Sequence, residues 1–239
     1  MTAVATAGAS ASAMAIPAFM LGRLAVVPDL SGALWLPDER TLVVADLHLE
    51  KGSAYAARGI FLPPYDSTAT LAALTAAVLR HAPSRVIALG DSFHDRDAEA
   101  RISATNLAAL RVLQAGRDWI WVTGNHDPQI SAAMGGDTAE TIDLAGVTLR
   151  HEPDARETGF EIAGHLHPAA KVRMRGRALR RRCFALSQRR CVMPAMGAYA
   201  GGLNLRDSAF RLLLGEGFCA HLLGDARLFR IDPRLLLPD

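Results

Sequence analysis

The 239-residue sequence lacks several features that mark particular classes of protein. Half of its residues are hydrophobic, yet no apolar run approaches the roughly 18 residues that a membrane span requires, so no membrane partner is expected. Its three cysteines, Cys183, Cys191 and Cys219, are odd in number and include no CxxC pair, which disfavours a disulfide framework. We therefore expect buried thiols in a reducing compartment, the cytoplasm.

Lysine is nearly absent, since Lys51 and Lys171 are the only two and arginine supplies the other basic side chains. This bias suits a GC-rich genome as well as a binding function, and the net charge of +2 identifies no partner. The distribution is more informative, because the stretch from Lys171 to Arg190 holds nine basic residues and no acidic one.

Basic residues are also missing from the N-terminus, where none precedes Arg23. A secretory signal needs a basic start followed by a strongly apolar core, and the small residues found here provide neither. We expect residues 1–20 to be a disordered tail. Residues 21–239 are expected to form a single domain, because a chain of this length can bury a sizeable core.

Short apolar runs organise the first half of the chain. Residues 41–45, 86–89 and 119–123 are partly β-branched and have the length of buried strands. Two segments with the apolar periodicity of helices lie between these runs. The first begins at Asp66 and is ended by Pro83, and the second covers residues 98–114. Alternation of strand and helix implies a largely parallel sheet.

From Thr141 onward the pattern changes to short strands separated by turns. These strands are expected at residues 141–144, 147–150, 161–163, 170–175, 179–185, 191–193, 209–214, 217–223 and 226–231. Two further strands, at 24–27 and 33–36, would begin a β-meander that leads into the strand at 41–45. The whole pattern predicts two sheets packed face to face, with helices on the outside.

Polar clusters directly follow the three strands of the first half. Asp46 and His48 follow the first strand, Asp91 the second, and Asn125 with His126 the third. In open α/β sheets, ligands bind at the carboxyl ends of the strands, where these side chains would meet.

Histidines strengthen this prediction, because six of the eight lie at strand ends or turns beside Gly, Asp or Asn. These are His48, His94, His126, His151, His165 and His167, whereas His81 and His221 are expected to be structural or surface residues. The DxH and HxH spacings place both polar side chains on one side of an extended segment. Nitrogen and oxygen ligands without thiolate favour Mn, Fe or Zn over Ca or a structural zinc site. Each motif alone could be a turn or a helix cap, but together they predict a pair of metal ions.

The ordered blocks DLH, GD, GNHD, H and GHLH, over residues 41–168, resemble the calcineurin-like metallophosphoesterase superfamily. The resemblance implies an α+β fold, a four-layer αββα sandwich of two mixed sheets flanked by helices. It also implies a metal-dependent phosphoesterase with two divalent ions, Mn(II) first and Fe or Zn as alternatives. By position, Asp46, His48 and His167 would bind one ion, Asn125, His151 and His165 the other, and Asp91 would bridge the two.

The same resemblance makes His126 the catalytic histidine that faces the substrate. A metal-bridging hydroxide would attack phosphorus, and His126 would protonate the leaving oxygen, with Asp127 or Asp95 orienting its ring. His94 departs from the spacing usual in the family, and it either touches the scissile phosphate or holds Asp95. Glu152 is a further nearby carboxylate that could support a metal ligand.

Flanking segments narrow the resemblance to the ligase-associated DNA damage response endonuclease group. They include LEKG at 49–52, LPPYD at 62–66, RRCFA at 181–185 and PAMGAYAGGLN at 194–204. This group implies a DNA endonuclease of bacterial repair, linked to a DNA ligase, a helicase and an exonuclease. The alternatives are a phosphodiesterase of small substrates, such as cyclic nucleotides or nucleotide-derived metabolites, and a non-catalytic scaffold. Retention of every ligand argues against the scaffold.

Lys171, Arg173 and Arg175 alternate along a predicted strand, directly after the loop that carries His165 and His167. They would share a face and contact phosphates of single-stranded or flexible DNA. The alternative is a solvated edge strand whose charges prevent aggregation. The apolar region 210–237 suits either a homodimer surface or core packing.

Overall fold

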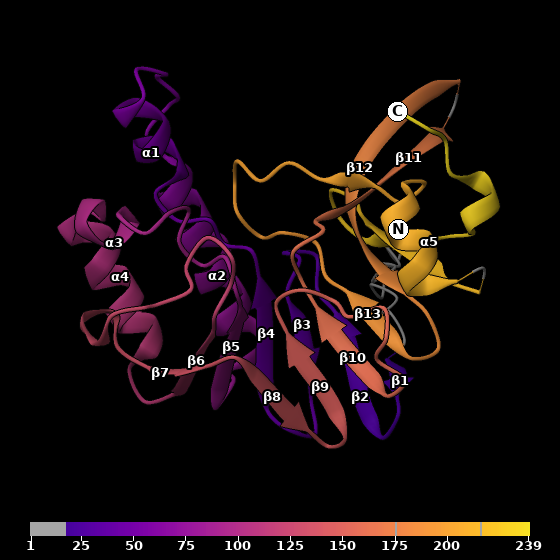
Figure 1. The fold of residues 1–239 in the computed structure, drawn as a ribbon, viewed down its shortest axis with the longest axis horizontal. Helices are drawn as coiled ribbons and strands as arrows, with labels where there is room; N and C mark the ends of the chain where they lie inside the picture. Colours follow the sequence, from indigo (N-terminus) through magenta and orange to yellow (C-terminus); the bar gives the residue numbers. More distant parts are fainter. Residues whose placement is uncertain (1–17, 175, 216) are drawn as a thin grey trace, which may run out of the picture.

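The computed structural model describes residues 18–174, 176–215 and 217–239, and it places them in two β-sheets packed face to face (Figure 1). The first sheet has seven strands in chain order. They are β1 (Phe19–Leu21), β2 (Leu24–Pro28), β3 (Leu34–Leu36), β4 (Thr41–Ala45), β5 (Arg85–Leu89), β6 (Asp118–Val122) and β7 (Asp137–Ala139). Neighbours are antiparallel from β1 to β4 and parallel from β4 to β7. The predicted meander and parallel sheet are thus both present.

The second sheet has nine strands and mixed directions. They are β8 (Thr141–Leu144), β9 (Val147–Arg150), β10 (Phe160–Ala163), β11 (Pro168–Met174), β12 (Arg177–Leu186), β13 (Arg190–Val192), β14 (Leu203–Asn204), β15 (Cys219–Leu223) and β16 (Leu228–Ile231). Their main order is β14-β11-β12-β13-β10-β9-β8, and β12 also pairs with β15, which pairs with β16. The hairpin of β11 and β12 extends beyond the body of the sheet (Figure 1).

Alternation along the strands divides the apolar residues between layers. In β4, Val43 and Ala45 enter the core between the two sheets, whereas Leu42 and Val44 pack beneath the helices. Those helices are α2 (Asp66–His81) and α4 (Ala104–Gln114), and α5 (Ser208–Leu214) covers the outer face of the second sheet. The result is the four-layer αββα sandwich, so the predicted fold class is confirmed.

Three helical regions differ from the sequence prediction. The sequence pattern does not predict α1 (Lys51–Ala57), because this helix is short and rich in small residues. The expected helix over residues 98–114 is two helices, α3 (Ala98–Arg101) and α4, because the Ser103 hydroxyl caps α4 by accepting from the Asn106 amide at 3.1 Å.

The expected strand at 209–214 is wrong, since these residues belong to α5. Asp207 caps its start by accepting from the Ala209 amide at 2.9 Å, and Phe210 and Leu214, one turn apart, are buried. A short apolar run does not separate strand from helix by itself. Two single 3₁₀ turns, Ala132–Met134 and Pro233–Leu235, complete the elements of the described chain.

The predicted N-terminal tail is too long at its C-terminal end. Phe19 and Met20, which were expected in the tail, belong to β1 and pair with β2. Leu21 of the same strand is buried in the core between the sheets. Residues 1–17 lie outside the described residues. Cys183 and Cys191 are buried free thiols, and Cys219 is partly exposed. Among the described helices, none combines the length and the apolar character that a membrane span requires. Most of the apolar C-terminal region packs in the core beneath α5.

Candidate metal centre

All seven predicted metal ligands lie at one end of the sandwich. Loops after β4, β5 and β6 bring Asp46, His48, Asp91 and Asn125, and loops after β9 and β10 bring His151, His165 and His167. Both sheets therefore contribute, although residues 46 and 167 are far apart in the sequence. The carboxyl ends of the strands meet there, as expected for ligand-binding sites in sheets of this kind.

Asp46, His48 and His167 form the first cluster. The Nε2 atoms of His48 and His167 are 3.2 Å apart, and His167 Nε2 is 3.3 Å from Asp46 Oδ1. Asp46 also accepts a hydrogen bond from the His165 amide at 3.0 Å, which joins the loops after β4 and β10.

A second cluster contains Asp91, His151 and His165, with Asn125 beside it. His151 Nε2 lies 2.9 Å from Asn125 Oδ1, 3.1 Å from His165 Nδ1 and 3.3 Å from Asp91 Oδ1. The other ring nitrogen of His151 donates to the Leu89 carbonyl at 3.0 Å, which leaves Nε2 as its lone-pair nitrogen.

Asp91 lies between the two clusters. Its Oδ1 is the oxygen nearest His151, whereas its Oδ2 is 4.0 Å from His48 Nε2. One carboxylate thus presents an oxygen to each cluster, which is the arrangement that a bridging ligand requires.

The spacing of these atoms fits divalent cations. Ligand atoms about 2.1 Å from a common cation lie roughly 3.0–3.4 Å from one another in octahedral or tetrahedral geometry. The distances of 3.1–3.3 Å within the two clusters match this range. Nitrogen and carboxylate oxygen are also the ligand types that Mn, Fe and Zn accept.

The electrostatics of these residues agree with this fit. Burial, with the nearby His167, lowers the pKa of His48 to about 3, so its imidazole is neutral and able to bind a metal. Burial opposes protonation of His151 as well, but its hydrogen bond to Asp91 and the charges of Asp46 and Asp91 raise its pKa to about 9. A cation held here would replace that proton between the carboxylates.

The backbone at the site is strained. Five of the seven residues, namely Asp46, His48, Asp91, His165 and His167, have φ values between 43° and 67°. Residues other than glycine rarely adopt this left-handed backbone conformation. Such strain persists where the surrounding structure holds the backbone in place. The hydrogen bonds of these loops provide that enforcement and bring the side chains together.

Asp127 supports the loop after β5. It is buried, and its carboxylate accepts from the amides of Asp91 (3.0 Å), Ser92 (2.7 Å), Phe93 (3.1 Å) and Gly124 (3.0 Å). The expectation that Asp127 orients the His126 ring is therefore wrong, because both of its oxygens are committed to the main chain.

The main-chain carbonyl of His94 holds the His126 ring instead, at 2.6 Å from Nδ1. Asp95 does not do so either, because it pairs with Arg101 at 2.6 Å and caps the Asp97 amide. The second option for His94, that it holds Asp95, is also not observed. Its ring stacks on that of His126 at 5.2 Å, at the mouth of the site.

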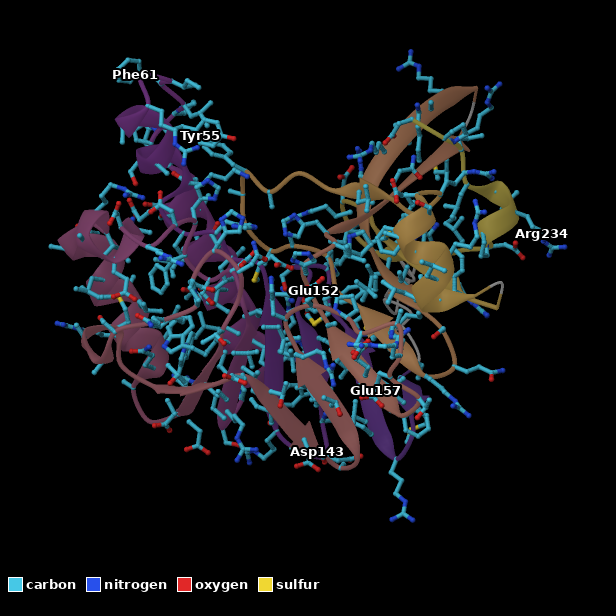
Figure 2. The ribbon with its side chains drawn as sticks, in the orientation of Figure 1. Tyr55, Phe61, Asp143, Glu152, Glu157 and Arg234 are labelled. Carbon is cyan, nitrogen blue, oxygen red and sulfur yellow. The ribbon has the colours of Figure 1, made fainter. Side chains whose placement is uncertain are left out.

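Two further residues at the mouth do not emerge from the sequence pattern. Tyr55 of α1 stacks on His94 at 6.0 Å. Burial and the charges of Lys51 and His126 lower the pKa of His94 to about 4, which puts Lys51 close to the site. Only recognition of α1 could have found them, because one helical turn brings positions 51 and 55 to the same face. Glu152 is exposed (Figure 2).

Residues 194–202, which we call the strap, cross from the second sheet to the helices of the first (Figure 1). The amide of Gly197 donates to the Asp46 carbonyl at 3.0 Å, and that of Leu203, just beyond the strap, donates to the His167 carbonyl at 3.0 Å. The Tyr199 hydroxyl donates to the Pro63 carbonyl at 2.7 Å. The strap thus links two ligand-bearing loops to the segment between α1 and α2.

The register of the β11–β12 hairpin defines its basic face. Lys171 is opposite Arg180, and Arg173 is opposite Ala178, so these side chains share one face with Arg182. Arg182 donates to the Ala195 carbonyl of the strap at 2.7 Å, which shows that this face is the one turned toward the strap. Arg175, the third predicted contact, lies outside the described residues.

Comparisons with known proteins agree with this geometry. Residues 39–173 match the family model described as Calcineurin-like phosphoesterase, which is more than half of the chain. The structure of Pseudomonas putida nuclease MPE is similar, with a TM-score of 0.68 and 28% sequence identity over 88% of this chain and 98% of that chain. No curated protein matches the sequence.

Two more distant structures are also similar in part. They are AQ665 from Aquifex aeolicus, a protein of unknown function (TM-score 0.37, 17% identity, 53% of this chain and 78% of that chain), and YfcE, a phosphoesterase from E. coli (TM-score 0.39, 13% identity, 80% of this chain and 97% of that chain). Likenesses this weak do not bear on the function of the chain.

Proposed function

The chain belongs to the calcineurin-like phosphoesterase family, and we propose that within this family of metal-dependent phosphoesterases it cleaves phosphodiester bonds of DNA. One observation carries the proposal: the basic face of the β11–β12 hairpin is turned toward the strap, whose Gly197 amide donates to the carbonyl of Asp46 in the first cluster. A phosphodiesterase of small metabolites has no need of such a row of cations, whereas DNA offers one phosphate per nucleotide. Similarity to a nuclease of P. putida supports the same substrate class.

We assign Asp46, His48 and His167 to one cation, Asn125, His151 and His165 to the other, and Asp91 to both. When bound, two divalent cations would supply Lewis-acid charge for the phosphate oxygens and a water acidic enough to act as a nucleophile near neutral pH. Mn(II) is the proposed metal, because the ligand set is nitrogen and oxygen only, and addition of Fe or Zn tests the alternatives.

His126 is the proposed general acid. Its Nδ1 must carry a hydrogen, because the carbonyl of His94 can only accept. Protonation at Nε2 is therefore the change that the ring can undergo, and Nε2 lies 3.9 Å from Asp91 Oδ2, next to both clusters. The side chain is 37% exposed, so an oxygen leaving from phosphorus can reach it.

Lys171 and Arg173 are the proposed phosphate contacts. Such contacts position a strand without reading its sequence, which suits a nuclease that acts at many sites. The narrower resemblance of the sequence supports a role in bacterial DNA repair together with a DNA ligase, a helicase and an exonuclease. Action on chromosomal DNA would place the protein in the cytoplasm.

Hydrolysis of circular single-stranded DNA tests the proposal. Metal-stripped protein is assayed alone, with Mn²⁺ restored, and beside a His126→Ala variant. We expect nicking that requires Mn²⁺ and fails in the variant, and because a circle has no ends, nicking also demonstrates endonuclease action. Turnover of a small aryl phosphodiester without any DNA cleavage would overturn the DNA substrate and favour the small-substrate alternative.

A further inference from the structure

Three large apolar side chains are exposed within six residues of the loop between α1 and α2. Phe61 is 84% exposed, Tyr65 68% and Ile60 51%, whereas the other exposed large apolar side chains of the described chain occur singly. Together α1 and residues 58–65 form what we call the arm, with Phe61 at its tip (Figure 2). Clustered exposed apolar groups of this kind mark binding surfaces.

The arm is continuous with the catalytic centre. Tyr55 lies lower on it (Figure 2) and stacks on His94 with an interplanar angle of 28°, and His94 stacks on His126 with an angle of 26°. The three rings, nearly parallel, lead from the arm to the proposed general acid. A ligand that follows this wall from the metal centre therefore reaches the exposed tip.

Hydrogen bonds anchor the arm. Beyond the Tyr199–Pro63 bond, the Ile60 amide donates to the Tyr55 carbonyl at 3.0 Å and the Tyr65 amide to the Pro63 carbonyl at 2.9 Å. Holding aromatic rings in place before binding reduces the entropy lost when a partner is bound. The surface thus has the properties of a preformed platform.

The charges near the arm favour a polyanion as the occupant. Lys51 and Arg58 of the arm are both basic, and the β11–β12 hairpin with its basic face stands across from α1 (Figure 1). A partner that is both polyanionic and rich in flat apolar faces fits this combination, and single-stranded nucleic acid is such a partner.

We propose that Phe61 and Tyr65 stack on unpaired nucleobases of the strand whose backbone passes the metal centre. The proposal rests on the proposed nuclease function and deepens it, because a duplex buries its base faces and offers nothing for these rings. The arm then selects unpaired DNA, while the hairpin contributes charge without regard to strand state.

A set of variants tests the platform. In Phe61→Ala/Tyr65→Ala, we expect kcat/KM for a single-stranded oligonucleotide to fall by about 10- to 100-fold, the usual effect of removing base–aromatic stacking. Turnover of bis(4-nitrophenyl) phosphate should not change, because this small substrate does not reach the tip. Leu79→Ala on α2, where the side chain is 76% exposed, is the matched control and should leave both activities unchanged.

The chemistry of the contact is tested at Phe61 alone. Phe61→Trp should keep kcat/KM for the oligonucleotide near that of the unaltered protein, whereas Phe61→Leu should lower it, because leucine keeps apolar area but cannot stack. Equal losses on both substrates would mean a structural role and would overturn the proposal. So would a kcat/KM for the oligonucleotide that is unchanged in the double variant. Absence of DNA cleavage in the unaltered protein would instead remove the proposed function on which the platform rests.

Discussion

The Nδ1 atom of His126 lies 2.6 Å from the main-chain carbonyl oxygen of His94. A carbonyl fixes the orientation and the tautomer of the ring, but unlike a carboxylate it adds no full negative charge. The ring is therefore positioned for proton transfer at Nε2 by the loop after β5, and the side chain of His94 remains free to stack on it.

Replacement of His126 should separate chemistry from metal binding. His126→Ala is expected to lower kcat by about 10²- to 10⁴-fold, the usual contribution of general acid–base catalysis, because the leaving oxygen loses its proton donor. Metal content, measured by elemental analysis after dialysis against Mn²⁺, should remain that of the unaltered protein. A variant that loses metal together with activity would make His126 a ligand instead.

Replacement of the shared carboxylate should affect both clusters. Asp91→Asn is expected to lower the number of bound Mn²⁺ ions per chain, because the amide offers one neutral oxygen in place of two charged ones. Asp95→Asn, in the same loop but paired with Arg101, is the matched control and should bind as much Mn²⁺ as the unaltered protein. Full metal occupancy in Asp91→Asn would contradict a bridging role.

Gly90 is required because of His151. A β-carbon at Gly90 would lie 2.4 Å from the Cγ and Nδ1 atoms of the His151 ring, so Gly90→Ala should displace this ligand and abolish metal-dependent activity. Gly116 provides the control, because its φ of 72° is close to the 67° of Gly90 but a β-carbon there would have no other atom within 4 Å. Gly116→Ala therefore introduces backbone strain without a steric clash. We expect both variants to lose some thermal stability and only Gly90→Ala to lose activity. Activity retained in Gly90→Ala would show that the His151 ring can move without consequence.

Asp29 should contribute stability that depends on pH. Burial alone would raise its pKa, but hydrogen bonds from Arg80 (2.5 Å), the Ser31 amide (2.8 Å) and His81 (2.8 Å) lower it to about 2. Because the folded-state pKa lies below the unfolded value, the stabilisation is present above pH 3.8 and is lost as pH falls toward 2. Asp29→Asn should lower the free energy of unfolding by about 2 kcal/mol at pH 7, which denaturant titration measures.

The difference between Asp29→Asn and the unaltered protein should shrink when the titration is repeated near pH 3. Asp232 provides the control, because hydrogen bonds from Arg234 lower its pKa to about 2 although its carboxylate is exposed to solvent. Solvent screens such pairs, so Asp232→Asn should have a smaller effect at pH 7. A pH-independent loss in Asp29→Asn would attribute it to packing.

The hairpin should govern the salt dependence of DNA cleavage. In Lys171→Ala/Arg173→Ala, the slope of log(kcat/KM) against log salt concentration should become shallower by roughly 1.5, because two contacts with single-strand phosphates are lost. Arg156→Ala/Arg234→Ala removes the same charge elsewhere on the surface, where Arg234 lies on the outer side of the molecule (Figure 2), and should leave the slope unchanged. Equal slopes in both double variants would exclude the hairpin as the contact.

Local patterns explain why the sequence predicts the sandwich but not every element. Val43 and Ile87 face the core between the sheets, and their neighbours Leu42 and Val86 face the core beneath the helices. The sequence alone shows this two-residue periodicity of apolar side chains. The helix at 208–214 resembles a strand in the sequence, because its short apolar run is compatible with either structure. Its cap at Asp207 and its burial against the second sheet decide the outcome.

The hydrogen-bond partners of the residues around His126 are harder to predict. Asp127 directly follows His126 in the sequence, yet its carboxylate accepts hydrogen bonds from main-chain amides up to 36 residues away and not from the His126 ring. Amides and carbonyls occur at every position, so a hydrogen bond to one of them leaves no mark in the sequence. Asp95 was expected to orient His126 or to be held by His94, but it pairs with Arg101, six residues away in the sequence. A contact between His94 and the scissile phosphate stays a prediction.

The sequence by itself determined which side chains occupy the ends of the strands, because each lies within a few residues of the strand that presents it. It also determined the order of the motifs and the basic character of the hairpin. Only the tertiary structure decided that loops from two sheets meet around Asp91, which oxygen faces which cluster, and that Tyr55 of the arm stacks on His94, which in turn stacks on His126. The physical reason is that sheet packing and hydrogen bonds between distant backbone segments bring these groups together, and neither has a periodicity that the sequence displays.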